Sequence, residues 1–238
     1  MKSQHWIAAT LALAAAGAVG VSAASVSPPP AAGSPVLVEL FQSQGCSSCP
    51  PANANLNAIA DRPDVIPLSF AVTYWDQLGW KDTFATPRFT ARQWDYAHSA
   101  GRGEVATPQM VINGGKQTIV GNDRQQLEAA ITAAPRHSGP QIRLTGDKLF
   151  IGAARGAPTS TIWVVRYDPR VNNVPIRAGE NGGRTLPHRN IVRQLTAIGT
   201  WSGAASSFAL PPNPNPVYRT AVLVQSGKGG PIVAAARS

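Results

Sequence analysis

The sequence predicts an α/β protein whose first part alternates strands and helices and whose last part is mainly antiparallel β. Two apolar segments, 36–41 and 64–72, flank a helical pattern, which is typical of a strand–helix–strand unit with parallel strands. Two further helical patterns follow before residue 136. Beyond that point, short apolar segments alternate with Gly- and Pro-rich turns and no helical period exceeds one turn, which predicts antiparallel strands.

Residues 1–24 have the features of a secretory signal peptide. Lys2 precedes an apolar run from Trp6 to Val21, and small residues follow the run. The run is too short for a typical membrane span, although an uncleaved anchor is the alternative. A Pro-rich linker follows at 25–35. We therefore expect a periplasmic or secreted protein that has no transmembrane span after cleavage and lies in a compartment where disulfides form.

The formal charge of +9 belongs to the second half of the chain. Residues 25–135 carry 7 basic and 9 acidic side chains, whereas residues 136–238 carry 13 basic and 3 acidic ones. Such a basic half favours weak contact with anionic surfaces such as lipid headgroups or an acidic partner, and a solvated Arg-rich face is the alternative. The basic residues are scattered and no aromatic residues are interleaved with them, so we expect no nucleic-acid partner.

Both cysteines of the chain, Cys46 and Cys49, lie where the first predicted strand becomes a helix. Pro50 and Pro51 suit the first turn of that helix, in which N–H groups lack partners. A helix N-terminus favours a thiolate and lowers the pKa of a cysteine, so a reactive dithiol is the leading interpretation. An inert disulfide is one alternative, although closing so short a loop stabilises a protein by only roughly 2 kcal/mol. A metal-binding pair is the other.

The cysteine turn is expected at the carboxyl end of its strand, where open α/β sheets place their binding sites. An insertion at about 74–101 follows the second strand. Its aromatic segment, 74–82, has no clean period and is expected to fold as a loop over the site, and the rest is expected to be helical. Trp75 and Trp80 are candidate substrate contacts, with packing between insertion and sheet as the alternative.

A Thr107-Pro108 step opens the next predicted strand. A proline at the start of an apolar strand that ends in a Gly-Gly turn indicates a special peptide bond. A single sequence does not reveal whether this bond is cis, since only about 5–6% of X-Pro bonds in folded proteins are. Residues 119–120 are expected to return as a hairpin partner, and Asp123 to cap a helix that Pro135 stops.

This order of elements over 36–135, with a dithiol before the first helix, resembles the thioredoxin fold. In that fold a cis-proline loop lies against the Cys-x-x-Cys pair, so the resemblance implies that Thr107 and Pro108 bind the substrate backbone. Thioredoxin also has a buried acid close to the position of Glu39, which implies proton transfer with Cys49. A structural carboxylate is the alternative for this residue.

Residues 136–238 are predicted to form a β-rich C-terminal domain or extension. The densest polar stretch in it is 177–190, which is also rich in glycine. Two Arg, a Glu, an Asn and a His in this stretch could converge on an anion or on the dithiol, and Arg184 and His188 are the candidates for binding a substrate. The alternative is a long hairpin loop tied by its own hydrogen bonds.

Four stretches, 38–52, 74–82, 107–114 and 179–192, together resemble a bacterial family of secreted, thioredoxin-like proteins that is catalogued as a domain of unknown function. Several distinct motifs in the same order make this resemblance far more specific than a lone Cys-x-x-Cys. The chain departs from the family in one place, because the Ala-Val-Thr at 71–73 stands where relatives often have His-Val-Asp.

We therefore expect thiol–disulfide exchange, in which Cys46 attacks a substrate disulfide and Cys49 resolves the mixed disulfide. The expected substrate is a protein or small-molecule thiol or disulfide, and neither a cofactor nor a metal is expected. One alternative is a non-catalytic binding protein with a structural disulfide. Another is a copper(I)-handling protein that has Met110 or His188 near the thiolates.

Overall fold

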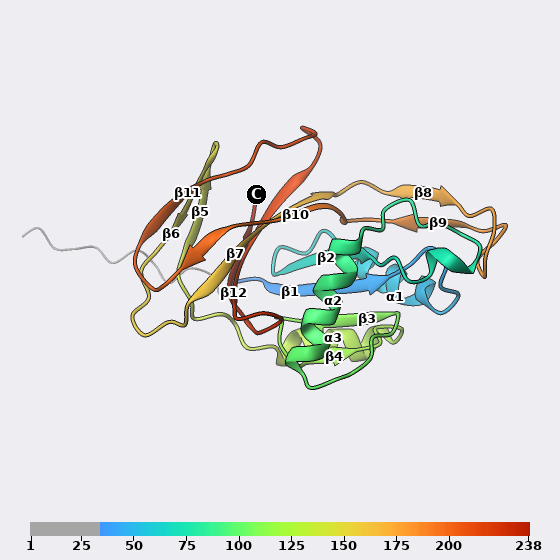
Figure 1. Ribbon diagram of the computed structural model, residues 1–238, viewed down its shortest axis with the longest axis horizontal. Helices are drawn as coiled ribbons and strands as arrows, with labels where there is room; N and C mark the ends of the chain where they lie inside the picture. The colour runs from blue at the N-terminus through green and yellow to red at the C-terminus, as the bar shows by residue number, and fades with distance from the viewer. Residues whose placement is uncertain (1–33) are drawn as a thin grey trace, which may run out of the picture. The chain divides into compact units, whose positions relative to one another are not determined.

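The computed structural model of the protein describes residues 34–238 (Figure 1). The predicted signal peptide and nearly all of the Pro-rich linker lie outside the described residues. Among residues 34–238, none of the helices has the length and hydropathy that a membrane span requires.

The described residues form a mixed α/β structure with three α-helices, α1 (Cys49–Ala58), α2 (Pro87–Ser99) and α3 (Arg124–Ala133). Eight strands make one mixed sheet, in the order β13 (Ile232–Arg237), β12 (Arg219–Ser226), β7 (Ser160–Asp168), β10 (Ile191–Trp201), β2 (Val65–Ala71), β1 (Val36–Gln42), β3 (Gln109–Ile112) and β4 (Thr118–Ile119). A second, antiparallel sheet has the order β11 (Ser206–Ala209), β6 (Lys148–Ile151) and β5 (Ile142–Thr145). A third consists of the hairpin β8 (Asn172–Pro175) and β9 (Thr185–His188).

The predicted α/β class and the antiparallel C-terminal strands are confirmed. β1 and β2 pair in parallel with α1 between them in the chain, and β1 pairs antiparallel with β3. β10 lies beside β2, so β7, β12 and β13 continue the same sheet. The sequence did not reveal β8, β9, β11 and β13. The first three are only four residues long and carry weak apolar patterns.

β1 is buried on both faces of the sheet. Leu37 and Phe41 pack with Phe89 of α2 on one face. Val38 and Leu40 pack with α1 and α3 on the other face. Because both faces are covered, β1 reads as a nearly continuous apolar run rather than an alternating one.

Glu39 is the charged exception in β1, and α2 supplies its partners. The Nε of Arg92 donates to one Glu39 carboxylate oxygen at 2.6 Å, and the Tyr96 hydroxyl donates to the other. Gln225 on β12 accepts a hydrogen bond from Arg92 at 3.1 Å, and all four side chains are buried. Burial lowers the pKa of Arg92, but Glu39, Tyr96 and Asp95 together outweigh burial, and the pKa is raised. The guanidinium therefore stays charged.

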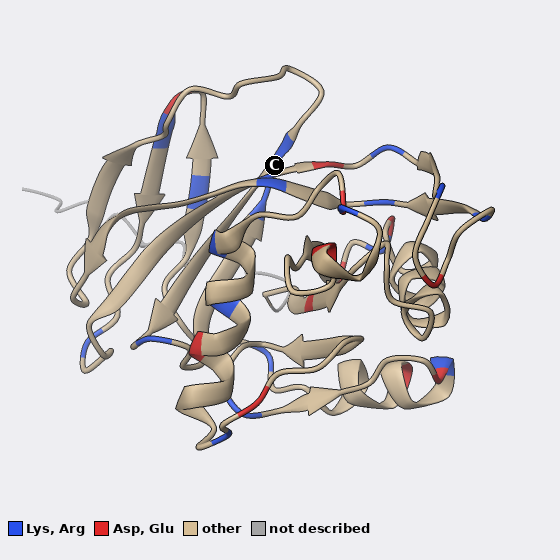
Figure 2. Cartoon of the chain, turned by 45° about the vertical axis from the view of Figure 1, so that its right-hand side comes forward, with Lys and Arg blue, Asp and Glu red and all other residues tan. Residues whose placement is uncertain are grey.

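The basic residues of 136–238 lie on several strands and loops, and Figure 2 shows Lys and Arg spread over the chain. Several of them are paired. Arg170 bonds Asp168 at 2.7 Å and Arg189 bonds Asp61 at 2.8 Å, while Arg166 donates to the carbonyl of Pro211 at 2.6 Å. Part of the positive charge is thus used within the fold.

Replacing Arg92 with methionine should strongly destabilise the protein, because it leaves the Glu39 carboxylate buried without a counter-charge. Losing one partner of a buried ion pair costs about 3–5 kcal/mol. Equilibrium unfolding in urea measures this free energy. Arg124→Ala is the matched control, since its ion pair with Glu128 is exposed and contributes less than about 1 kcal/mol. Equal losses in the two variants would contradict the assignment.

Candidate active site

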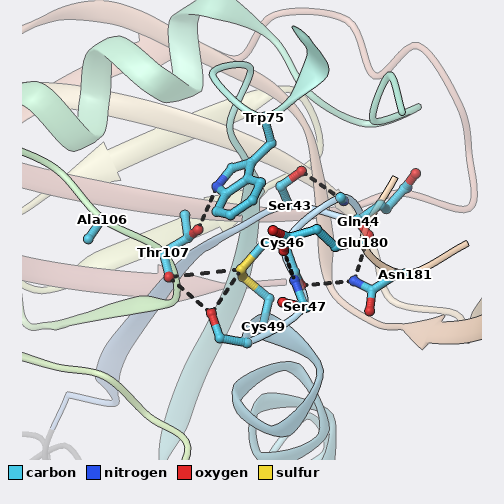
Figure 3. The surroundings of a disulfide bond; sticks show 12 residues. Ser43, Gln44, Cys46, Ser47, Cys49, Trp75, Ala106, Thr107, Glu180 and Asn181 are labelled. Atoms are coloured by element: carbon cyan, nitrogen blue, oxygen red, sulfur yellow. Dashed lines mark hydrogen bonds between the residues drawn. A yellow bond between two sulfur atoms is a disulfide. The ribbon is translucent and has the colours of Figure 1, made fainter. Parts of the chain in front are cut away.

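The cysteine turn connects the carboxyl end of β1 to the start of α1. Cys46 follows β1 after a short turn, and Cys49 is the first residue of α1. The two form a disulfide with their Cα atoms 5.4 Å apart (Figure 3). The predicted position at a strand-to-helix junction is confirmed.

The two prolines of α1 reduce the number of hydrogen-bond donors near the cysteines. Pro50 and Pro51 occupy the first turn of α1 and have no N–H, so the turn offers fewer donors than an ordinary helix N-terminus. The Ser48 hydroxyl lies 3.3 Å from the sulfur of Cys46 and is placed to donate to it. The same hydroxyl lies 3.5 Å from the carbonyl oxygen of Thr107, so this oxygen and the sulfur share one proton of Ser48.

Thr107 lies against the disulfide. Its carbonyl oxygen is 3.9 Å from the Cys46 sulfur, and the peptide bond to Pro108 is cis. The pairing of β3 with β1 brings this step beside the cysteine turn, because β3 begins directly after Pro108. The sequence left the isomer open, and the structure shows it.

The aromatic insertion lies on the same turn (Figure 3). The Trp75 indole N–H donates to the Thr107 hydroxyl at 2.7 Å, and the Trp80 indole N–H donates to the Gln44 side-chain oxygen at 2.9 Å. The Asp82 carboxylate accepts the Gln44 backbone N–H at 2.7 Å. Both tryptophans therefore hold the loop over the site, and their indole N–H groups are already used within the protein.

The β8–β9 hairpin reaches the cysteine turn from the other side. The Asn181 side-chain amide donates to the carbonyls of Gln44 at 2.9 Å and Cys46 at 2.8 Å. The Glu180 carboxylate accepts the backbone N–H of Ser47 at 2.9 Å, and this bond lowers the pKa of Glu180. Arg184 donates to the Asn181 side-chain oxygen at 2.7 Å. Arg184 thus orients Asn181, and the acidic residue and an asparagine of the polar stretch, Glu180 and Asn181, make the contacts with the cysteine turn.

Both cysteines are buried, with 0% of Cys46 and 1% of Cys49 exposed. The two serines between them are exposed. The turn therefore has a polar surface, while the disulfide beneath it is covered.

His188 does not serve as a surface ligand. It is 1% exposed, its ring packs edge-on against Phe84 at 6.0 Å, and neither ring nitrogen has a hydrogen-bond partner in the described chain. Burial lowers the pKa of His188 to about 4, so the ring is neutral at neutral pH. The side chain points into the protein, so the expected substrate contact would require His188 to leave this buried position.

Glu39 does not face the cysteines either. Its two carboxylate oxygens are taken by Arg92 and Tyr96 on the α2 face of the sheet, whereas α1 packs on the opposite face. The expected proton transfer with Cys49 therefore has no support in this geometry, and the carboxylate is structural.

The two residues considered as additional copper ligands are part of the core. Met110 packs between β1 and the helices α1 and α3, and His188 is buried beside Phe84. Among residues 34–238, no group of three or more His, Cys, Asp or Glu side chains is arranged to hold a metal ion. The chemistry that this arrangement supports best is that of the two sulfurs.

Comparison with known proteins gives a family and a fold. A family model described as a protein of unknown function, DUF1223, matches residues 37–225. The crystal structure of protein AGR_C_4864 from Agrobacterium tumefaciens is similar, with a TM-score of 0.70 and 29% identity over 85% of this chain and 92% of that one. HBP35 of Porphyromonas gingivalis has a TM-score of 0.55 and 12% identity over 87% and 75%, which concerns the fold alone. No curated protein matches the chain.

Lowering the pH should destabilise the protein through His188. Its pKa falls from 6.5 to about 4 on folding, so the unfolded chain binds more protons between these values and stability is lost as the pH drops through them. The shift corresponds to about 3 kcal/mol. We expect His188→Leu to remove this loss in urea titrations at pH 7 and pH 4. An unchanged pH slope in this variant would contradict the assignment.

Asp82 should act in the opposite direction. Burial raises its pKa from 3.8 to about 6, so the folded chain binds more protons in this range and stability is lost as the pH rises through 6. The two residues therefore offset one another between pH 4 and 6. Asp82→Asn should make the acid sensitivity of the protein steeper in the same titrations, and a flatter profile would contradict this.

Proposed function

This chain belongs to the DUF1223 family of proteins of unknown function, and we propose that it is an exported thiol–disulfide oxidoreductase. Its substrate is a protein or a small-molecule thiol or disulfide. The observation that carries the proposal is the Cys46–Cys49 disulfide at the start of α1, with the carbonyl of Thr107 in a cis Thr-Pro step 3.9 Å from the Cys46 sulfur.

The arrangement around the disulfide favours a thioredoxin-like core. Four strands lie in the order β2, β1, β3 and β4, the first two parallel and the others antiparallel. α1 and α3 pack on one face and α2 on the other. The similarity to the Agrobacterium tumefaciens structure supports this arrangement of strands and helices and names no activity.

The chemistry is an exchange of disulfides that consumes and releases thiolates. The Cys46 thiolate attacks one sulfur of a substrate disulfide, and the other substrate sulfur leaves as a thiolate. The Cys49 thiolate then attacks the Cys46 sulfur, which frees the second substrate thiolate and restores the Cys46–Cys49 bond. The substrate gains two electrons and the dithiol loses them, and the same steps in reverse oxidise a substrate dithiol. Cys46 is the attacking residue because it lies outside the helix beside Ser48 and Thr107.

Export follows from the N-terminal signal-like segment, and an oxidising compartment suits the pair of cysteines. The burial of both cysteines favours a second candidate, a non-catalytic binding protein in which the bond is structural. The reduction potential separates the two. A structural bond has a potential below about −300 mV, and an exchanging bond lies above it. Equilibration with dithiothreitol buffers measures this value.

The reduced protein should reduce a fluorogenic disulfide peptide, with dithiothreitol regenerating its thiols. Replacing Cys46 with serine should abolish this protein-dependent reduction. Cys49→Ala should instead accumulate a mixed disulfide at Cys46, visible by mass spectrometry. Ser47→Ala is the control, because it changes the same turn and keeps both thiols. Retained turnover in Cys46→Ser would contradict the mechanism.

A further inference from the structure

The buried disulfide raises the question of how a thiolate reaches it. Attack requires access to the sulfur of Cys46. This residue is 0% exposed, and Trp75, Thr107 and the connection between β8 and β9 surround it (Figure 3). At least one of these elements must move before exchange.

The connection, residues 176–184, joins β8 and β9 and lies outside the eight-stranded sheet, whereas Thr107 lies just before β3 and Trp75 just after β2. Its hydrogen bonds to the turn come from two adjacent side chains and go to backbone groups of Gln44, Cys46 and Ser47. Asn181 is fully buried at this contact. The sulfur itself receives no bond from the connection in the described structure, so releasing the connection breaks hydrogen bonds to the backbone of the turn and none to the sulfur.

The connection is also held together by its own hydrogen bonds, so it can move as a unit. Its backbone bonds join Ile176 to Arg184 at 2.8 Å and Gly183 to Ile176 at 2.8 Å, and Arg184 holds the Asn181 side chain. Its base is fixed separately, because two asparagines of α1 donate to the carbonyl of Pro187 at 2.6 and 2.9 Å. The tip can therefore separate from the turn while the hairpin stays attached.

We propose that residues 176–184 form a latch that closes over the disulfide, and that an extended polypeptide substrate displaces it. The inference rests on the proposed function and adds its substrate class. The Asn181 amide donates to two backbone carbonyls and the Glu180 carboxylate accepts a backbone N–H, which is the pattern that a peptide backbone offers. A polypeptide beside the turn can replace these bonds. A small disulfide cannot replace these hydrogen bonds, so its exchange depends on spontaneous opening of the latch.

The first test measures reduction of the oxidised protein by dithiothreitol at neutral pH, followed by alkylation and mass spectrometry. One dithiothreitol sulfur attacks Cys46 and Cys49 leaves as a thiolate, and closure of the cyclic disulfide then frees Cys46. Asn181→Asp keeps the size of the side chain but removes its donors, and should react about tenfold faster or more, as loss of two hydrogen bonds implies. Arg177→Ala, an exposed change in the same connection, should match the parent protein.

Faster reduction must not come from global unfolding. Each variant is therefore compared at a temperature well below its own unfolding midpoint. Glu180→Gln, at an exposed position, is a second variant, and its disulfide should be reduced a few-fold faster than that of the parent protein. Equal rates for the parent, Asn181→Asp and Glu180→Gln would overturn the latch.

The second test compares a disulfide peptide with hydroxyethyl disulfide as substrates of the reduced protein. We expect the parent protein to have the higher kcat/KM with the peptide. In Asn181→Asp, kcat/KM should rise mainly for hydroxyethyl disulfide, so the ratio of peptide to hydroxyethyl disulfide kcat/KM falls. An unchanged ratio would overturn the substrate class. If Asn181→Asp is reduced faster but neither protein exchanges with any substrate, the latch stands and the proposed function fails. If the parent protein exchanges with a substrate but the variants have the parent's rates, the proposed function stands and the latch fails.

Discussion

Burial of β1 on both of its faces constrains the rest of the structure. A strand in this position cannot leave a charge uncompensated, so Glu39 requires Arg92 and Tyr96 from α2. Arg92 in turn bonds Gln225 on β12, which comes from the far end of the chain. One acidic residue in the first strand thereby ties the first helical insertion and the C-terminal strands to the same core.

The same strand positions the cysteines. Because β1 pairs with β2 on one side and β3 on the other, its carboxyl end lies beside both the end of β2 and the start of β3. The first neighbour leads into the aromatic insertion and the second begins after the cis Thr107-Pro108 step. The cysteine turn therefore has two neighbouring segments, the aromatic insertion and the Thr107-Pro108 step. The connection between β8 and β9, from the C-terminal part of the chain, is the third. Any partner of Cys46 meets all three segments.

Local patterns in the sequence were enough to predict the junction of strand and helix at the cysteines, the helices and most longer strands. They could not predict which face of the sheet α1 covers, and for that reason they did not reveal that Glu39 faces Arg92 and Tyr96 rather than the cysteines. The contact of Asn181 with Cys46 spans 135 residues, and an asparagine in a Gly-rich loop carries no local sign of such a partner. His188 is misleading in the same way, because polar neighbours in the sequence surround a side chain that the fold buries beside Phe84.

Covering a disulfide affects its chemistry as well as its access. A thiolate in a dry site is disfavoured, whereas a helix N-terminus and a hydroxyl such as that of Ser48 favour it. The prolines of α1 remove N–H groups from the first turn, so the helix offers Cys46 fewer donors. In the proposed closed state residues 176–184 lie over the cysteine turn, and in the proposed open state Ser48 stays beside the sulfur because it belongs to the turn itself. Since the latch bonds the backbone and not the sulfur, its opening does not require prior reduction, and a partner that displaces it gains access to Cys46.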